Sequence, residues 1–437
     1  MGFIKSIIRA LRLNRVWWKV KKLPPIKQII AYYKKKKRER KRALNRLHLE
    51  EFLNHTIPEA YDSCREKPID ERKVVFIEPR YNTLSNNFKE IYNTLENEYD
   101  FNLKVCMLNE IDSTKEEFEQ NCVDMVKEVA TAKYVFLDEA SRPFSAINKR
   151  KETIATQLWH ACGAFKKFGF STADLIFGSD AELLKLFPFY KNLNYVTVSS
   201  PVVTWAYEEA MMLKDSDTEV VATGVSRTDN FFKDDTIKNA YEKLYSLMPS
   251  AKGKKIILYA PTFRGRVKKA KSPDEIDLGA FYAEMSDEYV MLFKHHPFVK
   301  TRPEVADEYK IFACDMTDDM TIDELLCVSD ICISDYSSLV FEYSLFERPM
   351  IFFAYDIDLY NDWRGFYYDY DELTPGPVFT TNEEIIDYIK NIDTKFDKQQ
   401  VIDFKNKFMS ACDGHATERI LKLVFGDSLG ANKRMKS

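Results

Sequence analysis

The chain has 437 residues, of which 45% are hydrophobic and 30% charged, so it can bury more than one core and lies outside the composition of disordered chains. Its 13 glycines and 16 prolines exclude a collagen-like or linker-rich architecture. The formal net charge of −4 hides an asymmetry, because residues 1–47 hold 17 Lys and Arg against one acid, Glu39, while the remainder holds 47 basic and 67 acidic residues.

The eight cysteines form no CxxC pair, and several lie inside strand-like apolar runs. This pattern favours buried free thiols in a reducing compartment over a disulfide framework or a zinc site. No apolar stretch approaches the ~18 to 20 residues that span a bilayer, and charges follow Met1 too closely for a cleaved secretory signal. We therefore expect an intracellular protein with no metal centre.

Residues 1–57 are predicted to form a basic amphipathic helical segment that lies on an anionic membrane surface. The side chains predicted to make this contact are apolar, aromatic or cationic: Phe3, Ile4, Ile7, Ile8, Leu11, Trp17, Trp18, Lys34, Lys35, Lys36 and Lys37. Each cation near such a surface contributes about 1 kcal/mol. A solvated basic helix and an arm that binds nucleic acid are the alternatives.

From about residue 70, short β-branched or aromatic runs alternate with helical stretches, which is typical of βα units and a mostly parallel sheet. The first series of predicted strands is Lys73–Ile77, Phe101–Leu108, Lys133–Leu137, Asp174–Phe177, Tyr195–Val198 and Glu219–Thr223. The second series is Lys254–Ala260, Tyr289–Phe293, Tyr309–Ala313, Ile331–Ser334 and Met350–Phe353. Helices are predicted at Lys398–Ser410 and His415–Phe425.

Two such series predict an α/β protein with two doubly wound, Rossmann-like domains, over residues 70–235 and 236–437. The polar helical stretch Asp234–Ser250 is the predicted join. When two domains of this kind face each other, the carboxyl ends of their strands line a shared cleft, and that cleft is where we expect chemistry.

The sharpest local signal follows the strand Ile331–Ser334, which turns through Asp335 and Tyr336 directly into an apolar helix. Ser337 and Ser338 are therefore predicted at a helix N-terminus, where backbone N–H groups and hydroxyls favour a phosphate. An ordinary serine cap has the same pattern, but the predicted cleft favours a diphosphate site.

Two more strands are predicted to deliver polar side chains to the same edge. Thr262 and Arg264 follow the strand at Lys254–Ala260, and an arginine there can clamp phosphate oxygens, although a surface loop has the same appearance. Lys294, His295 and His296 follow the strand at Tyr289–Phe293. Neighbouring histidines point to opposite sides of an extended chain, so at most one faces the cleft, and we favour His296 because Pro297 fixes its direction.

In the first half of the chain, His160 follows Trp159 at the start of an apparent helix. An imidazole can take the proton from an attacking hydroxyl, which is what group transfer to an alcohol requires, although a structural histidine fits the sequence equally well. GxxxxGK[ST] is absent and no GxGxxG follows a strand, which disfavours ATP hydrolysis and dinucleotide redox chemistry.

Together these residues resemble the CDP-glycerol glycerophosphotransferase family, the teichoic-acid polymerases and primases of Gram-positive bacteria. The resemblance runs over roughly residues 70 to 425. It is carried by Trp159-His160 with Lys166, Gly224-Val225-Ser226-Arg227-Thr228-Asp229, Tyr259-Ala260-Pro261-Thr262-Phe263-Arg264, His296-Pro297, Ser334-Asp335-Tyr336-Ser337-Ser338, Arg364-Gly365-Phe366 and Asp413-Gly414.

The resemblance implies a GT-B fold and a peripheral enzyme on the cytoplasmic face of the cell membrane. The implied reaction transfers glycerol phosphate from CDP-glycerol to a lipid-linked acceptor with release of CMP, without a cofactor. Relatives that use CDP-ribitol share the pattern, so ribitol is an alternative polyol. A GT-B glycosyltransferase that uses a UDP-sugar is a further alternative, and the oligomeric state is left open.

Carried over residue by residue, His160 and His296 match the functional histidines of the family. The predicted donor-phosphate contacts are Thr262, Arg264, Lys294, Ser337 and Ser338, and further contacts to the donor or acceptor are predicted at Asp335, Arg364 and Lys166. The chain departs from the common pattern at Ala161-Cys162 and at Ser226. The hypothesis is an in-line attack of an acceptor hydroxyl on the β-phosphorus, with His160 as the general base, although which histidine takes the proton is left open.

Overall fold

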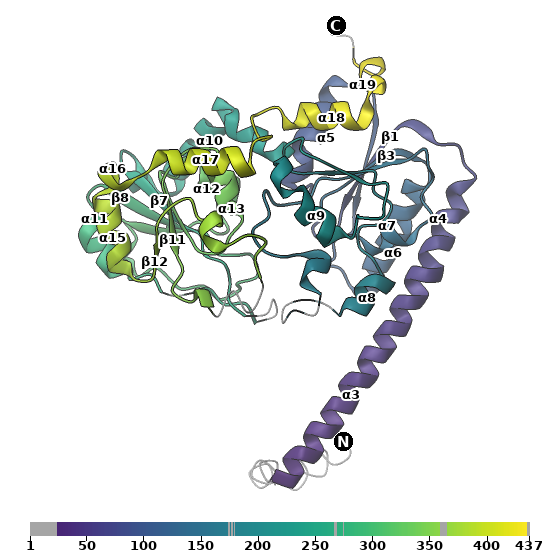
Figure 1. Cartoon of the computed structure of the whole chain (residues 1–437), viewed down its shortest axis with the longest axis horizontal. Coiled ribbons are helices and arrows are strands. Elements are labelled where there is room, and N and C mark those ends of the chain that lie inside the picture. The colour runs from purple at the N-terminus through teal and green to yellow at the C-terminus, as the bar shows by residue number, and fades with distance from the viewer. Residues whose placement is uncertain are drawn as a thin grey trace. The chain divides into compact units, whose positions relative to one another are not determined.

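A computed structural model (Figure 1) describes residues 24–434 apart from 174, 176–177, 179, 266–268, 274 and 359–364. The chain divides into two compact units, the first ending at Glu59 and the second beginning at Ala60. The first unit contains the long helix α3 (Pro24–Glu51) and the π-helical turn η1 (Phe52–Thr56), after which α4 (Ile57–Arg65) begins. Lys34, Lys35, Lys36 and Lys37 are exposed on α3. The predicted membrane contacts from Phe3 to Trp18 lie outside the described residues. Among the helices described, none is both long and apolar enough to cross a bilayer.

The first sheet of the second unit has six parallel strands in the order β2-β1-β3-β4-β5-β6. Their bounds are β1 Asp70–Glu78, β2 Asn102–Met107, β3 Ala132–Leu137, β4 Ile154–Gln157, β5 Tyr195–Thr197 and β6 Glu219–Val221. The pairing aligns Ile77 with Leu137 and Leu137 with Gln157. Because parallel strands that end in register deliver their loops to one edge, the residues after β1, β3 and β4 meet there.

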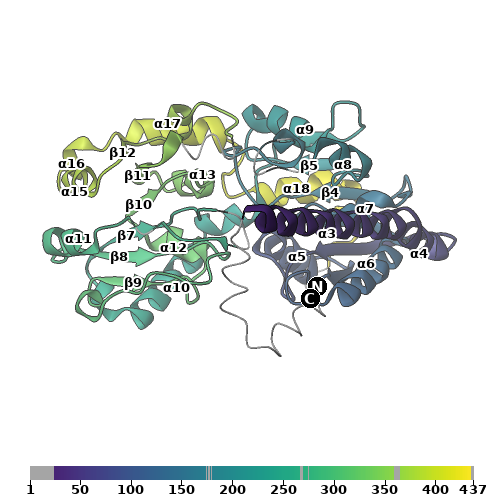
Figure 2. The same ribbon diagram turned by 90° about the horizontal axis from the view of Figure 1, so that it is seen from below.

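The second sheet also has six parallel strands, in the order β12-β11-β10-β7-β8-β9, and Figure 2 shows it beside the first. Its strands are β7 Lys255–Tyr259, β8 Tyr289–Phe293, β9 Ala313–Asp315, β10 Ile331–Ser334, β11 Met350–Phe353 and β12 Val378–Phe379. Tyr259 pairs with both Ile333 and Phe293, so the loops that begin at Ala260, Lys294 and Asp335 lie next to one another. This arrangement confirms the predicted α/β fold with two doubly wound, Rossmann-like sheets.

Helices and short helical turns separate the strands throughout both halves. Those of the first half are α5 Asn86–Glu98, α6 Lys115–Val129, α7 Arg142–Ala146, η2 Gly169–Thr172, α8 Ala181–Leu186, η3 Pro201–Val203, α9 Thr204–Met211 and η4 Ser226–Phe232. Then come α10 Asp234–Leu247, η5 Pro249–Ala251, α11 Leu278–Met285, η7 Asp307–Tyr309, α12 Ile322–Val328, α13 Leu339–Ser344, η8 Tyr370–Leu373, α15 Asn382–Lys390, α16 Ile392–Lys395, α17 Lys398–Phe408, α18 Ala416–Phe425 and α19 Asp427–Ala431. Capping boxes at Thr114, Thr321 and Thr381 begin three of them.

One strand prediction differs from the structure, one lies largely outside the described residues, and two strands were not predicted. Tyr309 ends a 3-10 turn instead of beginning a strand, and β9 starts only at Ala313, because the apolar run there first packs as a turn. The predicted strand Asp174–Phe177 lies largely outside the described residues. Strands β4 and β12 were missed because β4 is short and half polar and β12 has two residues.

The end of the chain returns to the first sheet. Ile420, Val424 and Phe425 of α18 pack with Val74 and Phe136 in one apolar core. The ring centroid of Phe425 lies 4.3 Å from that of Tyr134. The predicted C-terminal domain, residues 236–437, included α18. The amphipathic pattern of α18 indicates a half-buried helix, but it does not indicate which of the two sheets the helix packs against.

Candidate active site

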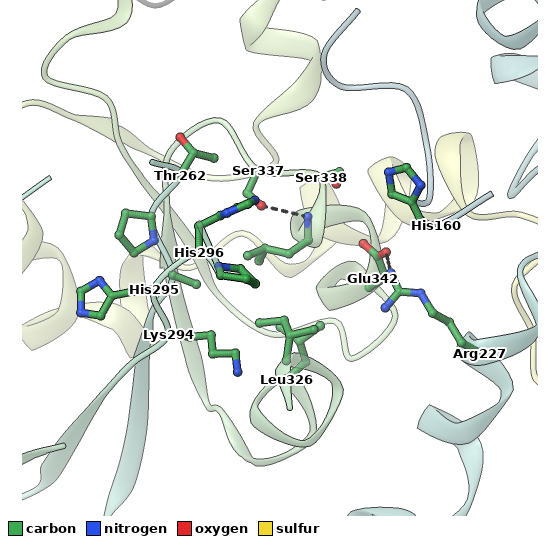
Figure 3. Close-up of a pocket in the computed structure, with 15 residues that line it drawn as sticks. His160, Arg227, Thr262, Lys294, His295, His296, Leu326, Ser337, Ser338 and Glu342 are labelled. Atoms are coloured by element: carbon green, nitrogen blue, oxygen red, sulfur yellow. Dashed lines mark hydrogen bonds and ion pairs between the residues drawn. The ribbon is translucent and has the colours of Figure 1, made fainter. Parts of the chain in front are cut away.

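The aligned strand ends of the two sheets border a cleft of about 440 Å³, within the range of about 300 to 1,000 Å³ typical of small-molecule sites. Figure 3 shows His160 and Arg227 on one side, with Thr262, Lys294 and His296 on the other. The full lining is His160, Arg227, Ala260, Pro261, Thr262, Lys294, His295, His296, Pro297, Ile322, Leu326, Ser337, Ser338, Leu339 and Glu342. The structure therefore brings six of the predicted residues together: His160, Thr262, Lys294, His296, Ser337 and Ser338.

His160 is presented to the cleft by an unusual backbone turn just beyond β4. Trp159 has a φ of 59°, a left-handed conformation that costs a bulky residue energy. The turn is held by Gln157, whose Oε1 accepts the N–H of Trp159 at 3.0 Å and whose Nε2 donates to the carbonyl of Glu139 at 3.0 Å. The rings of Trp159 and His160 lie 4.2 Å apart. His160 is thus in a turn, and the apparent helix predicted at this position is absent from the described segment.

The surroundings of His160 favour a neutral ring whose proton is on Nδ1. That nitrogen lies 3.2 Å from Oε1 of Glu139 and 3.4 Å from the carbonyl oxygen of Asp138, and a carbonyl can only accept. Although 38% of the side chain is exposed, burial of the ring, together with the charges of Arg80 and Arg227, lowers the pKa of His160 to about 4. Nε2 then carries the lone pair, so His160 can accept a proton at neutral pH.

His296 has the opposite arrangement. Its Nδ1 accepts the backbone N–H of Phe298 at 3.2 Å, so in the neutral ring the proton is on Nε2. The ring lies 4.7 Å from each of Phe263 and Phe298. His295 is buried, its Nδ1 lies 2.7 Å from Oγ of Ser272, and its ring points away from the other labelled side chains in Figure 3. Of the two neighbours, His296 is therefore the one with a hydrogen-bond donor suited to an anion.

Cationic and hydroxyl groups line the same side. The ammonium of Lys294 donates to the carbonyls of Thr317 and Met320 at 2.7 and 2.6 Å, and burial lowers its pKa. Ser337 and Ser338 precede α13, which has six residues, and the N–H of Leu339 lies 3.4 Å from Oγ of Ser337. Because α13 is short, its first N–H groups and the two hydroxyls contribute more here than a helix dipole would.

Arg264 and Asp335 do not line the cleft as described but brace its wall. Arg264 donates to both carboxylate oxygens of Asp356, at 2.6 and 2.9 Å, and to Asp335 at 2.9 Å. Asp335 also accepts the N–H and hydroxyl of Thr262, at 2.8 and 3.0 Å. The structure therefore places Arg264 as a bracket between the loops after β7, β10 and β11, whereas the sequence predicted a phosphate contact from its position after a strand.

Lys166 and Arg364 have different outcomes. The backbone of Lys166 forms an isolated antiparallel bridge with Phe366. The residue lines a smaller pocket of about 130 Å³ that shares His160 and Ser338 with the cleft. Arg364 lies outside the described residues.

Two charged cleft residues received no role from the sequence. Arg227, from η4, pairs with Asp323 at 2.8 Å and with Glu342 of α13. Burial, which lowers the pKa of Arg227, is outweighed by these two carboxylates, which raise it. Burial raises the pKa of Glu342, and its Oε2 has no hydrogen-bond partner among the described residues. In the sequence, the signal for Glu342 was its position as the single acidic residue of the apolar helix that follows Ser338.

A metal site is not apparent in the described part of the chain, where no three His, Cys, Asp or Glu side chains gather to hold an ion. The prediction that no cofactor is needed stays a prediction. Both histidines and the hydroxyl groups of the cleft instead suit proton transfer beside a bound anion.

Known proteins share this fold and part of the sequence. The teichoic acid poly(ribitol-phosphate) polymerase of Bacillus spizizenii is 38% identical over 372 residues, 84% of this chain but 58% of that one, so the chain spans less than two thirds of that relative's length. The teichoic acid ribitol-phosphate primase of the same species is 31% identical over 363 residues, 82% of this chain and 92% of that one. A structure of the wall teichoic acid polymerase TagF, as a variant soaked with CDPG, has a TM-score of 0.70 at 22% identity and covers 89% of this chain and 97% of that one, which shows a shared fold.

Residues 59–426, which make up most of the chain, match the sequence model of one protein family. Both faces of the cleft lie inside this range, so the match includes the two histidines and the serine turn. The chain belongs to the CDP-glycerol:poly(glycerophosphate) glycerophosphotransferase family.

Proposed function

We propose that this protein transfers a polyol phosphate from a CDP-polyol to the terminal hydroxyl of a lipid-linked teichoic-acid-type acceptor, with release of CMP. The observation that carries the proposal is the position of His160 across the cleft from His296, Lys294 and the Ser337 turn. Relatives described as ribitol-phosphate enzymes favour ribitol as the polyol, and the TagF soak with CDPG supports a cytidine diphosphate donor.

In the proposed reaction, the acceptor oxygen attacks the β-phosphorus in line with the bond to CMP. The O–H bond of the acceptor breaks as Nε2 of His160 takes its proton, a new P–O bond forms, and the bond to the CMP oxygen breaks. The Nε2–H of His296, the ammonium of Lys294 and the hydroxyls of Ser337 and Ser338 would stabilise charge on the diphosphate, and Thr262, whose hydroxyl donates to Asp335, would shape the wall beside it. Positioning and electrostatic stabilisation of this kind dominate phosphoryl transfer in general.

The donor can be identified by thermal unfolding with each nucleotide. We expect CDP-ribitol to stabilise the protein most, CDP-glycerol less, and a UDP-sugar or CMP alone least. A donor at 100 times its Kd should raise the free energy of unfolding by about 2.7 kcal/mol. A protein stabilised only by the UDP-sugar would contradict the proposal, and equal stabilisation by both CDP-polyols would contradict the preference for ribitol.

We further propose that the protein is peripheral to the cytoplasmic face of the cell membrane and binds there through its basic segment. The support is the row of exposed lysines on α3, where the one acid before residue 48, Glu39, lies 3.6 Å from Lys36. A lipid-linked polyanion lies at an anionic surface, and attachment to that surface raises its effective concentration.

Replacing Lys34, Lys35, Lys36 and Lys37 together by Gln should weaken binding to anionic vesicles. At about 1 kcal/mol for each lysine, the expected loss in affinity is about 10³-fold, with no change on neutral vesicles. The matched control replaces the same four residues by Arg, which keeps the charge. Binding that is equal in all three proteins, or retained on heparin but absent on lipid, would contradict the membrane assignment.

A further inference from the structure

We propose that Glu139 is a positioning residue for His160. Its carboxylate lies 3.2 Å from Nδ1 of the imidazole, on the side where the Asp138 carbonyl accepts the ring N–H at 3.4 Å, and its charge favours the proton on Nδ1, so that Nε2 is the nitrogen that meets the acceptor hydroxyl. The inference rests on the proposed function and assigns a role to a residue that the sequence did not single out.

Contacts from three neighbours hold Glu139 in place. Its Oε1 lies 3.2 Å from Nδ1 of His160 and 2.9 Å from Nη2 of Arg80, and its backbone carbonyl accepts Nε2 of Gln157 at 3.0 Å. The side chain of Glu139 is 14% exposed. A carboxylate whose Oε1 contacts both a guanidinium and an imidazole has little freedom to turn, which is what orientation of a base requires.

The sheet explains why these groups meet. Arg80 follows β1 by two residues and Glu139 follows β3 by two residues, and the two strands pair in parallel up to Ile77 and Leu137. His160 follows β4, the next strand in the sheet, by three residues. Three neighbouring strand ends therefore supply the cation, the carboxylate and the imidazole in that order.

The proton balance gives the carboxylate a purpose. When Nε2 of His160 takes the proton of the acceptor hydroxyl, the ring becomes an imidazolium with a proton on each nitrogen. The proton stays on Nδ1, which lies 3.2 Å from Oε1 of Glu139, and the negative charge of that carboxylate stabilises the cation. After CMP leaves, Nε2 returns its proton to solvent, and the neutral tautomer is restored. The carbonyl of Asp138, 3.4 Å from Nδ1, orients the ring but carries no charge to stabilise it.

The charges around the pair predict how its activity depends on pH. The charged groups facing His160 are Asp138, Glu139, Arg80 and Arg227, and Glu110 also faces Glu139. Burial raises the pKa of Glu139 to about 7, against the opposing effect of Arg80. The carboxylate is therefore present above that pH and lost as the pH falls through it, so kcat/KM of the wild type should decline below about pH 7.

The test compares Glu139→Gln and Glu139→Ala with the wild type, using CDP-ribitol or CDP-glycerol and an acceptor analogue. Glu139→Ala should lower kcat about 10- to 100-fold, by analogy with the carboxylates that orient metal-binding histidines, with KM for the donor unchanged. Glu139→Gln keeps a hydrogen-bond acceptor and should retain more activity, but its kcat/KM should no longer decline near pH 7.

The control is Glu128→Gln. Glu128 lies on α6 in the same half of the chain, and its carboxylate pairs with Lys73 at 2.6 Å. This variant should keep both the rate and the pH profile. Wild-type kcat in Glu139→Ala, or a decline near pH 7 that persists in Glu139→Gln, would overturn the inference. A wild type that binds neither CDP-polyol and transfers no polyol phosphate would instead overturn the proposed function.

Discussion

Replacing His160 by Ala should lower kcat about 10²- to 10⁴-fold, the range that general-base catalysis contributes. The reason is that Nε2 of His160 is placed to take the acceptor proton, because Nδ1 is held by Glu139 and Asp138. KM for the CDP-polyol should change little, since the proposed diphosphate contacts lie across the cleft. Steady-state kinetics with a CDP-polyol and an acceptor analogue measure both quantities.

Two controls make this result specific. His415→Ala removes a histidine whose side chain is 68% exposed and lies outside the cleft lining, so its kinetics should match the wild type. His296→Ala should also lower kcat, about 10²- to 10³-fold, because it removes a donor to the diphosphate, and it should weaken donor binding as well. A His160→Ala protein that folds normally and turns over at the wild-type rate would remove His160 from the chemistry.

Replacing Arg227 by Ala should lower the free energy of unfolding by about 3 to 5 kcal/mol, the usual result of removing one partner from a buried ion pair. The side chain of Arg227 is 12% exposed, and its partners Asp323 and Glu342 are 17% and 2% exposed. Both carboxylates would lose their cation, and no other cation is recorded with Asp323 or Glu342 in the described residues. Urea unfolding, followed as the midpoint and slope, measures the loss.

The pH dependence of that loss provides a further check. Burial already raises the pKa of Glu342, and removal of Arg227 should raise it more. A carboxyl whose folded-state pKa is raised favours the folded state when protonated, so the deficit of Arg227→Ala should be smallest at acidic pH and grow as the pH rises through the raised pKa.

Matched variants show whether the buried charge is the cause. In Arg227→Ala/Glu342→Gln the second change removes the unpaired carboxylate and should restore part of the stability. Arg302→Ala removes an arginine that is 25% exposed and pairs with Asp318, which is 75% exposed, and at 3.4 Å with Asp315, which is 24% exposed, so it should cost less than the loss of Arg227, about 1 kcal/mol. Equal losses in Arg227→Ala and Arg302→Ala would contradict a stabilising role for the buried pair.

Much of the fold was predictable because its signals are local. A buried parallel strand has to be a short, continuous apolar run, so Tyr289–Phe293, Ile331–Ser334 and Met350–Phe353 were found with their observed bounds. Strand β4 was missed because its four residues, Ile154–Gln157, include two polar side chains that only the neighbouring strands make acceptable.

The candidate site was predictable in part for a related reason. Residues that follow a strand are candidates for any site at that edge of the sheet. This rule selected His160, His296, Thr262 and Ser338, and all four line the cleft. Arg264 satisfied the same rule, yet it binds Asp335 and Asp356 in the wall. Whether a cation faces a cleft or braces it depends on carboxylates 71 and 92 residues away, and sequence position does not reveal those contacts.

The sequence by itself determined the α/β class, the two series of parallel strands, the basic segment and the family. These properties follow from composition, periodicity and short motifs, each of which is complete within a few neighbouring residues. Only the tertiary structure decided that α18 returns to the first sheet, that Glu139 meets His160, and that Arg227 joins Glu342. Such contacts arise when strand registers and helix faces are combined, so they depend on the whole packed chain and on no single segment of it.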